Sequence, residues 1–120
     1  MNIGGCRACE TCFKTGKACS FNDDFNTIAP AIQEADAVVF STPVYWYSIP
    51  SQIKAVIDKL FSFYNAKVDL SGKECALISC CEENDESVFD GVRVPIERSA
   101  ALLNWKMVGT VLVPAVVNVG

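Results

Sequence analysis

Residues 37–64, AVVFSTPVYWYSIPSQIKAVIDKLFSFY, decide the fold of this 120-residue chain. The segment 37–41 is an almost continuous apolar run with β-branched and aromatic members, which is typical of a parallel strand covered on both faces. From Ile53 to Tyr64 the apolar residues recur at helical spacing, so this segment is predicted to form one amphipathic helix, with Ser48 as a possible cap. The stretch therefore predicts a strand, a loop and a helix in that order.

Three consecutive aromatic residues, Tyr45, Trp46 and Tyr47, occupy the loop between this strand and this helix. In open α/β sheets ligands bind at the carboxyl ends of the strands, which is where these side chains are expected. Aromatic faces and the free N–H groups of a helix start suit a flat conjugated ligand. The same residues could instead form a protein interface or cap the core, and the sequence alone leaves these readings open.

Two further apolar runs, 75–79 and 108–113, predict buried strands. A helix is predicted after Asp23 and Asp24, with a start near Thr27 as the alternative because Pro30 would then lie in the first turn. Another helix is predicted within 87–105, although Gly91 and Pro95 would interrupt it, and Asn104 could be its left-handed C-terminal cap. Alternating strands and helices favour parallel βαβ units, with the three strands in sequence order and helices on both faces of the sheet.

The N-terminal segment carries four of the seven cysteines, Cys6, Cys9, Cys12 and Cys19, in a C-x2-C-x2-C-x6-C array. Two consecutive C-x2-C spacings allow thiolates to converge on one point, as in iron–sulfur sites with four cysteine ligands. Zinc could use the same four ligands, and free thiols are the third reading. No export signal opens the chain, so disulfides are not expected.

Composition excludes several classes of function. The formal charge of −4 and the pI of about 4.7 disfavour nucleic acid and anionic membranes as partners. The absence of histidine excludes Ser-His-Asp and Cys-His catalysis and every histidine-containing metal site. The length suits a single domain, 1–120, with a cysteine-rich segment 1–22 and βα units over 23–120. No membrane helix or signal peptide is evident, so we expect a cytoplasmic protein.

The segment 42–60, TPVYWYSIPSQIKAVIDKL, resembles the flavin-ring loop and following helix of flavodoxin-like NAD(P)H-dependent FMN reductases. Within that group the chain is most similar to the iron–sulfur flavoproteins. The cysteine array, Asp23-Asp24, 76–79 and 112–114 support the resemblance. It implies an α/β fold, a flavodoxin-like three-layer sandwich with a parallel sheet, and FMN as cofactor.

The resemblance also implies where cofactors bind. A [4Fe-4S] cluster would be held by Cys6, Cys9, Cys12 and Cys19. The flavin ring would be held by Thr42, Pro43, Val44, Tyr45, Trp46, Tyr47, Ser48, Ser79, Cys80 and Cys81. For Cys80 and Cys81 the alternative is that they are small core or loop residues. No catalytic side chain is predicted, because the flavin itself carries the chemistry.

Part of the flavodoxin-like pattern has no counterpart in the sequence. The first strand with its phosphate-binding turn and the final helix are not matched, so we expect an incomplete sandwich that binds FMN weakly. The strand at 37–41 would then have an open edge, which predicts a homo-oligomer.

Three functions are consistent with this pattern. The first is an FMN-dependent oxidoreductase that passes electrons from NAD(P)H to a small molecule or a protein. The second is an electron-transfer protein with a cluster and a flavin. The third is a truncated fragment without tight cofactor binding.

Overall fold

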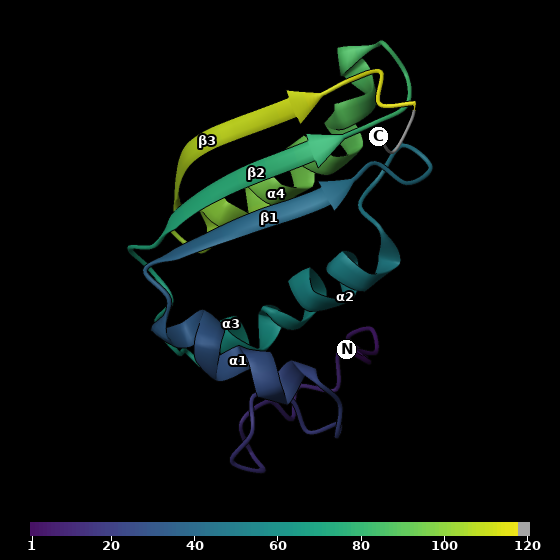
Figure 1. Cartoon of the computed structure of the whole chain (residues 1–120). Helices are drawn as coiled ribbons and strands as arrows, with labels where there is room; N and C mark the ends of the chain where they lie inside the picture. Colours follow the sequence, from purple (N-terminus) through teal and green to yellow (C-terminus); the bar gives the residue numbers. More distant parts are fainter. Residues whose placement is uncertain (118–120) are drawn as a thin grey trace. The chain divides into compact units, whose positions relative to one another are not determined.

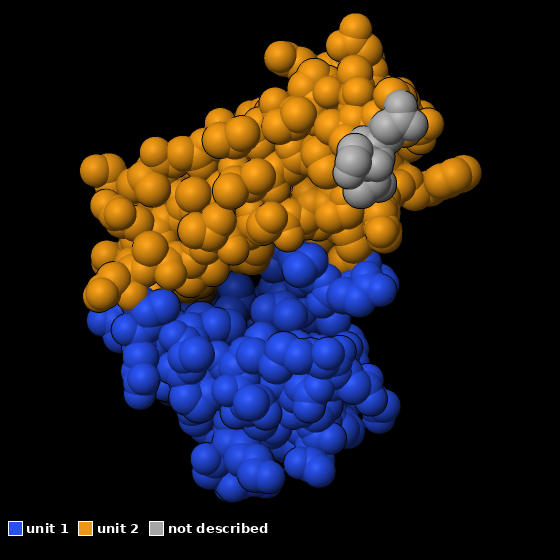
Figure 2. Space-filling model, in the orientation of Figure 1, with its two compact units in different colours: residues 1–35, 51–71 blue, residues 36–50, 72–120 orange. Residues whose placement is uncertain are grey.

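The computed structural model describes residues 1–117 and divides into two compact units (Figure 2). Unit 1 comprises residues 1–35 and 51–71 and contains the cysteine array and three helices. Unit 2 comprises residues 36–50 and 72–120 and contains a three-stranded sheet and a helix. Among the helices of residues 1–117, none combines the length and the apolar character needed to cross a bilayer.

The sheet of unit 2 is built from β1 (Ala37–Pro43), β2 (Glu74–Cys80) and β3 (Lys106–Val113). All three strands are parallel and stand in sequence order, as their arrows in Figure 1 show. The three predicted strands and their order are therefore confirmed. Because the strands run in one direction, their carboxyl ends meet at one edge of the sheet.

One face of this sheet packs against the 3-10 helix η1 (Glu86–Phe89) and the helix α4 (Asp90–Leu102). The side chains of Leu77, Phe89, Val92 and Ile96 are fully buried there. Gly91 and Pro95 both lie inside α4, so they do not interrupt it as their helix-breaking character suggests. The helix ends before Asn104, whose positive φ of 55° confirms its predicted role as a left-handed cap.

The opposite face of the sheet is apolar and exposed. Val39, Ile78, Val111 and Val113 point to this face in register and are between 44% and 57% exposed. Within unit 2, as far as it is described, no helix covers this face, so the second helical layer that the sequence predicts is not part of this unit.

Unit 1 contains α1 (Phe25–Glu34), and the alternative start near Thr27 is wrong. The helix begins earlier because Phe25 is fully buried and donates its N–H to the Asp23 side chain at 3.1 Å. The N–H groups of Asn26 and Thr27 bond the carbonyls of Asp23 and Asp24 in turn. Pro30 consequently lies inside the helix rather than in its first turn.

The helix predicted from Ile53 to Tyr64 is two helices, α2 (Ser51–Lys59) and α3 (Phe61–Asn65). The N–H of Leu60 is shared between the carbonyls of Val56 and Ile57, which tightens the last turn of α2. Phe63 of α3 packs against Phe13 and Phe25, with ring centroids 5.6 and 6.3 Å apart. These aromatic contacts lie outside the local helical pattern, so the sequence periodicity could not reveal the break.

Candidate functional site

The aromatic residues after β1 form a tight turn at the carboxyl edge of the sheet. The N–H of Tyr45 donates to the carbonyl of Ser48, and the N–H of Ser48 donates to the carbonyl of Tyr45, both at 3.0 Å. Trp46 and Tyr47 lie between them with φ of 50° and 62°. Positive φ at both central residues defines a type I′ turn. Ser48 is therefore part of this turn, and its predicted role as a helix cap is wrong because α2 begins at Ser51.

This turn is strained and solvent-exposed. Type I′ turns favour Asn-Gly, and a side chain such as Trp or Tyr in the left-handed region costs on the order of 1 kcal/mol or more. Trp46 is 95% exposed, and Tyr45 and Tyr47 are about 60% exposed, so within the described chain they do not cap the core. Strain of this kind persists where the surroundings enforce it, and it is concentrated at ligand sites.

A cavity of about 260 Å³ opens beside the turn. Its lining comes from the turn, from the loop after β2 and from η1: Val44, Trp46, Tyr47, Cys81, Glu82, Glu83 and Val88. Ligand pockets in proteins are typically about 300–1,000 Å³, so this space suits the ring portion of a cofactor rather than the whole molecule. Apolar walls and two carboxylates define its chemistry.

Hydrogen bonds hold the two walls of this cavity together. The N–H of Val44 donates to the carbonyl of Cys80 at 2.9 Å, which extends the pairing of β1 and β2 toward the turn. The Tyr47 hydroxyl donates to the Glu83 carboxylate, and this hydrogen bond raises the pKa of Tyr47. The Cys81 thiol donates to the carbonyl of Glu83 at 3.2 Å. The Val44–Cys80 and Tyr47–Glu83 hydrogen bonds thus join the aromatic wall to the acidic wall.

Backbone hydrogen bonds connect the end of β3 and the segment that follows it to the loop after β2, which forms the acidic wall. The N–H of Cys81 donates to the carbonyl of Val113 at 3.1 Å, and the N–H of Val116 donates back to Cys81 at 2.9 Å. The N–H of Ala115 reaches the carbonyl of Glu83 at 3.0 Å. These bonds continue the β2–β3 ladder beyond the strands and fix the loop after β2.

The ten residues predicted to hold the flavin are not equally placed. Val44, Trp46, Tyr47 and Cys81 line the cavity. Thr42 and Ser79 are register partners within the sheet and are 4% and 2% exposed. The remaining four, Pro43, Tyr45, Ser48 and Cys80, border these residues along the chain without lining the cavity. The sequence thus predicted the segments, and the fold selects the side chains.

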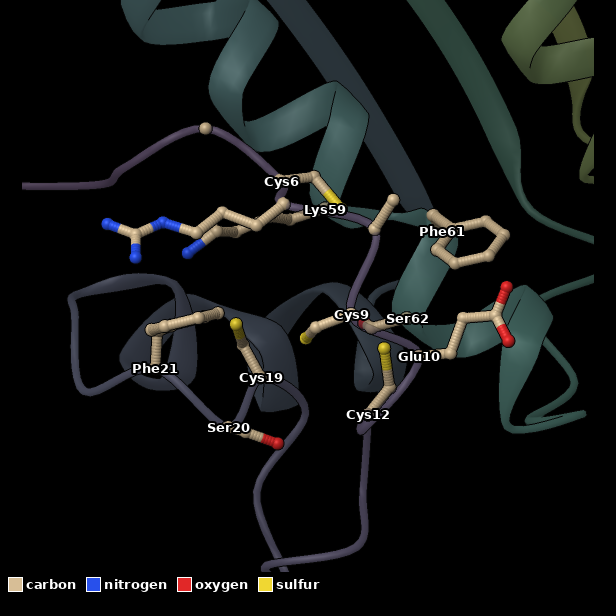
Figure 3. A pocket seen from close by; sticks show the side chains of 13 residues that line it. Cys6, Cys9, Glu10, Cys12, Cys19, Ser20, Phe21, Lys59, Phe61 and Ser62 are labelled. Carbon is tan, nitrogen blue, oxygen red and sulfur yellow. The ribbon is translucent and has the colours of Figure 1, made fainter.

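The cysteine array forms a second candidate site, entirely within unit 1 (Figure 3). Figure 3 shows the sulfur atoms of Cys9, Cys12 and Cys19 facing a common space, with Cys6 apart from them. Lys59 and Ser62 line the same pocket and are 3% exposed. The Ser62 hydroxyl has no hydrogen-bond partner within residues 1–117. A buried hydroxyl without a partner is costly and points to a missing acceptor.

Two of these thiols have shifted pKa values. The Thr11 hydroxyl lies 3.0 Å from the Cys9 sulfur, and this hydrogen bond lowers the pKa of Cys9. Burial raises the pKa of Cys12, and the neighbouring Cys9 and Cys19 raise it further. The repulsion from Cys9 and Cys19 reflects the proximity of these thiols to Cys12.

The arrangement in this pocket does not provide a formed metal site. Among residues 1–117, no three Cys, Asp or Glu side chains are placed to hold a metal ion. The pocket volume of about 20 Å³ corresponds to roughly one water molecule. The four cysteines are the right type of ligand for an iron–sulfur cluster. The space between them is too small to hold one, so the segment would have to open to bind a cluster.

A buried ion pair and the hydrogen bonds of the Asn26 side chain connect the cysteine segment to the helices of unit 1. The Lys59 ammonium donates to the Asp23 carboxylate, which also accepts the Gly4 N–H at 3.0 Å. The Asn26 side chain accepts the Cys19 N–H at 2.8 Å and donates to the carbonyls of Cys19 and Phe21. Asn26 therefore fixes the backbone of the fourth cysteine.

Sequence reasoning missed several residues of both sites. Asn26 and Lys59 look like ordinary helix positions, and no local spacing links them to the cysteines. Glu83 belongs to the acidic run 82–86, which looks like a solvated loop in the sequence, although its carboxylate accepts a hydrogen bond from the Tyr47 hydroxyl. Only the fold brings these partners together.

The model of the family described as NADPH-dependent FMN reductase matches residues 3–115. The chain belongs to this family. Among curated relatives is an iron–sulfur flavoprotein of Archaeoglobus fulgidus, 34% identical over 71 residues, which are 59% of this chain and 31% of the relative. An iron–sulfur flavoprotein of Methanosarcina thermophila is 29% identical over 77 residues, 64% of this chain and 40% of the relative. The chain thus spans less than half the length of these relatives.

A solved structure supports the same fold. The Trp repressor binding protein from Bacillus subtilis aligns with a TM-score of 0.66 at 21% identity. The alignment covers 76% of this chain and 62% of that one. At this identity the likeness shows the fold alone, and it agrees with the flavodoxin-like α/β class expected from the sequence.

Asp23 gives unit 1 a pH-dependent contribution to stability. Burial raises the pKa of Asp23, but hydrogen bonds from Lys59 and from the Gly4 and Phe25 N–H groups outweigh it, so its pKa lies below the ordinary value. A depressed pKa stabilises the fold above the unfolded pKa of about 3.9, and this stability is lost as the pH falls through the folded pKa. We predict a steep loss of stability below about pH 4.

The measurement is urea unfolding between neutral pH and the acid range. Asp23→Asn should be less stable than wild type at neutral pH and should show a shallower acid dependence. Asp58→Asn removes a carboxylate that is 41% exposed, keeps Asp23 and should retain the wild-type slope. Equal acid slopes for wild type and Asp23→Asn would contradict the role of this ion pair.

Proposed function

We propose that this chain is part of an FMN-dependent oxidoreductase that transfers electrons from reduced nicotinamide through a flavin to a small-molecule or protein acceptor. The observation that carries the proposal is the strained aromatic turn 45–48, which opens onto the cavity at the carboxyl edge of the sheet. Membership of the NADPH-dependent FMN reductase family supports it. Reduced nicotinamide as electron donor and a small molecule or protein as acceptor are inferred from the general chemistry of flavins, and not from a specific pocket.

The residues of unit 2 would bind and orient the flavin ring. When bound, FMN accepts hydride from nicotinamide and releases electrons singly or in pairs. Trp46 and Tyr47 offer exposed aromatic faces on one side of the cavity, and Val44 and Cys81 form its apolar floor. We extend the proposal to the whole predicted set, with Thr42, Pro43, Tyr45, Ser48, Ser79 and Cys80 shaping these segments. No side-chain acid or base is required.

This proposal predicts that FMN binding depends on Trp46. Replacing Trp46 by Ala should raise the FMN dissociation constant about tenfold, because an aromatic contact contributes about 0.5–1.5 kcal/mol and 1.4 kcal/mol corresponds to tenfold. The control is Tyr64→Ala, which removes a ring that is 60% exposed on α3 in unit 1. The measurement is a titration that follows quenching of flavin fluorescence.

Two results would decide against the proposal. One is the absence of saturable FMN binding by the wild-type chain at micromolar protein, which would favour the reading of a fragment without tight cofactor binding. The other is an equal loss of affinity in the Trp46 and Tyr64 variants, which would place the flavin away from the turn.

A second function, electron transfer through an iron–sulfur cluster, is favoured by a specific observation. The Ser62 hydroxyl is buried without a partner in the pocket that the four cysteines line. Thiolate or sulfide acceptors in this pocket would satisfy it. The names of the iron–sulfur flavoprotein relatives agree with this candidate. We propose Cys6, Cys9, Cys12 and Cys19 as the ligands of a [4Fe-4S] cluster that binds when segment 6–19 opens.

The cluster is tested by anaerobic reconstitution with iron and sulfide. We expect broad visible absorption and about four irons per chain in wild type, and loss of both in Cys12→Ala, because each thiolate is a direct ligand. Cys75→Ala changes a buried cysteine of β2 outside the array and should retain the cluster. Zinc binding without colour, or four titratable thiols after reconstitution, would exclude the cluster.

We also propose that the chain forms a homo-oligomer in the cytoplasm. In the sheet as described, β1 pairs on one side only, with β2, and the face that carries Val39, Ile78 and Val111 is exposed. Open strand edges and apolar faces favour association. A sizing run on the FMN titration samples should give a mass above the 13.0 kDa of one chain, and a monomer would contradict this proposal.

Reduced thiols in the array suit a cytoplasmic location.

A further inference from the structure

Gly91, the second residue of α4, lies directly against the backbone of the aromatic turn. A Cβ atom built on Gly91 would stand 1.7 Å from the carbonyl oxygen of Tyr47 and 2.9 Å from its carbonyl carbon. It would also stand 3.2 Å from the Cα of Ser48. All three atoms belong to the backbone, so no side-chain rotation could relieve the overlap. Any other residue at position 91 would displace the turn or the start of α4.

The contact is specific to this glycine. A Cβ on Gly109 of β3, in the same unit, would meet no atom of the described residues within 4 Å. Gly91 lies within a helix, and its φ is not positive, unlike the φ of Gly16 and Gly72. Gly91 is therefore required for space rather than for conformational freedom.

The neighbourhood explains why the contact matters for the turn. The carbonyl oxygen of Tyr47 faces Gly91 in the first turn of α4. The hydrogen that glycine has in place of Cβ points to this oxygen, which is the arrangement of a weak Cα–H···O contact. The hydroxyl of the same Tyr47 is held by Glu83. Tyr47 is thus fixed at both its backbone and its side chain.

We propose that Gly91 is a positioning residue for the flavin-ring site, which holds Trp46 and Tyr47 in their left-handed conformation by close approach of α4. The effect of Gly91 on the conformation of the turn is inferred from the described contacts. Its effect on cofactor binding rests on the proposed FMN function. Turn residues in the left-handed region persist only where the surroundings enforce them. The α4 backbone supplies that enforcement.

The test compares Gly91→Ala with Gly109→Ala in the full chain. In a helix, Ala is more favourable than Gly by about 1 kcal/mol, so without the contact the first substitution would stabilise the protein. With the contact, the Tyr47 oxygen must move by roughly 1.3 Å to lie 3.0 Å from the new Cβ, the shortest distance that real Cβ atoms show. A misplacement of about 1 Å can cost an enzyme a hundredfold in rate, so the site should be sensitive to this shift. We expect the FMN dissociation constant to rise at least tenfold in Gly91→Ala and to stay within twofold in Gly109→Ala.

Hydrogen–deuterium exchange of the cofactor-free variants provides a readout that does not depend on FMN. Peptides spanning 44–50 should exchange faster in Gly91→Ala, because the two hydrogen bonds between Tyr45 and Ser48 weaken. Peptides of β2 and of residues 94–102 should remain protected. Gly109→Ala should match wild type over 44–50.

The outcomes separate this inference from the proposed function. If wild type binds no FMN, the proposed function fails, and the exchange of 44–50 alone decides whether Gly91 holds the turn. Unchanged exchange of 44–50 in Gly91→Ala overturns the inference, whatever the FMN affinity. Loss of protection throughout α4 and the strands also overturns it, because Gly91 would then be needed for folding rather than for positioning the turn.

Discussion

Parallel pairing of β1 with β2, and of β2 with β3, is the constraint on which the rest of unit 2 depends. It brings the loops after β1 and β2 to the same edge, so that Val44 can donate to the carbonyl of Cys80 and Tyr47 can reach Glu83. A candidate ligand site arises there because the strand ends converge, although its residues are about 35 positions apart along the chain. The α4 backbone then supports the turn from one side.

Unit 1 depends on polar contacts as much as on its small aromatic core. The carboxylate of Asp23 and the amide of Asn26 receive backbone N–H groups from the N-terminal segment and from Cys19. The N-terminal segment has no regular secondary structure before α1, so these side chains take the place of a strand ladder. Asp23, just before α1, and Asn26, in its first turn, therefore hold the backbone of the N-terminal segment at Gly4 and Cys19.

The sequence predicted the sheet well because the strands carry their own signal. Runs such as Ala37-Val38-Val39-Phe40 are apolar throughout and rich in β-branched residues, which favours parallel strands, although one face of this sheet is exposed. The break at Leu60 was not predictable, since the helical spacing continues through it and the cause is the distant partner Phe13 of Phe63. Pro30 misled the prediction of the start of α1 for the same reason: burial of Phe25 outweighs a local preference.

The candidate cavity is lined in part by residues from the segments that the sequence singled out, and its geometry was not predicted. Trp46 and Tyr47 carry no turn signal, because type I′ turns are normally recognised by Asn-Gly. Gly91 appeared only as a possible interruption of a helix, and its actual role, close approach to Tyr47, involves a residue 44 positions earlier. Contacts between segments that are distant in sequence are the part that pattern reasoning cannot supply.

The most direct test of the account is anaerobic mixing of the FMN-loaded chain with NADPH or NADH, with the visible absorption of oxidised flavin as the signal. The account predicts that the flavin band bleaches much faster with the protein than with free FMN at the same concentrations, and that air restores it. Bleaching no faster than for free FMN would contradict the assignment of this chain to flavin-mediated electron transfer.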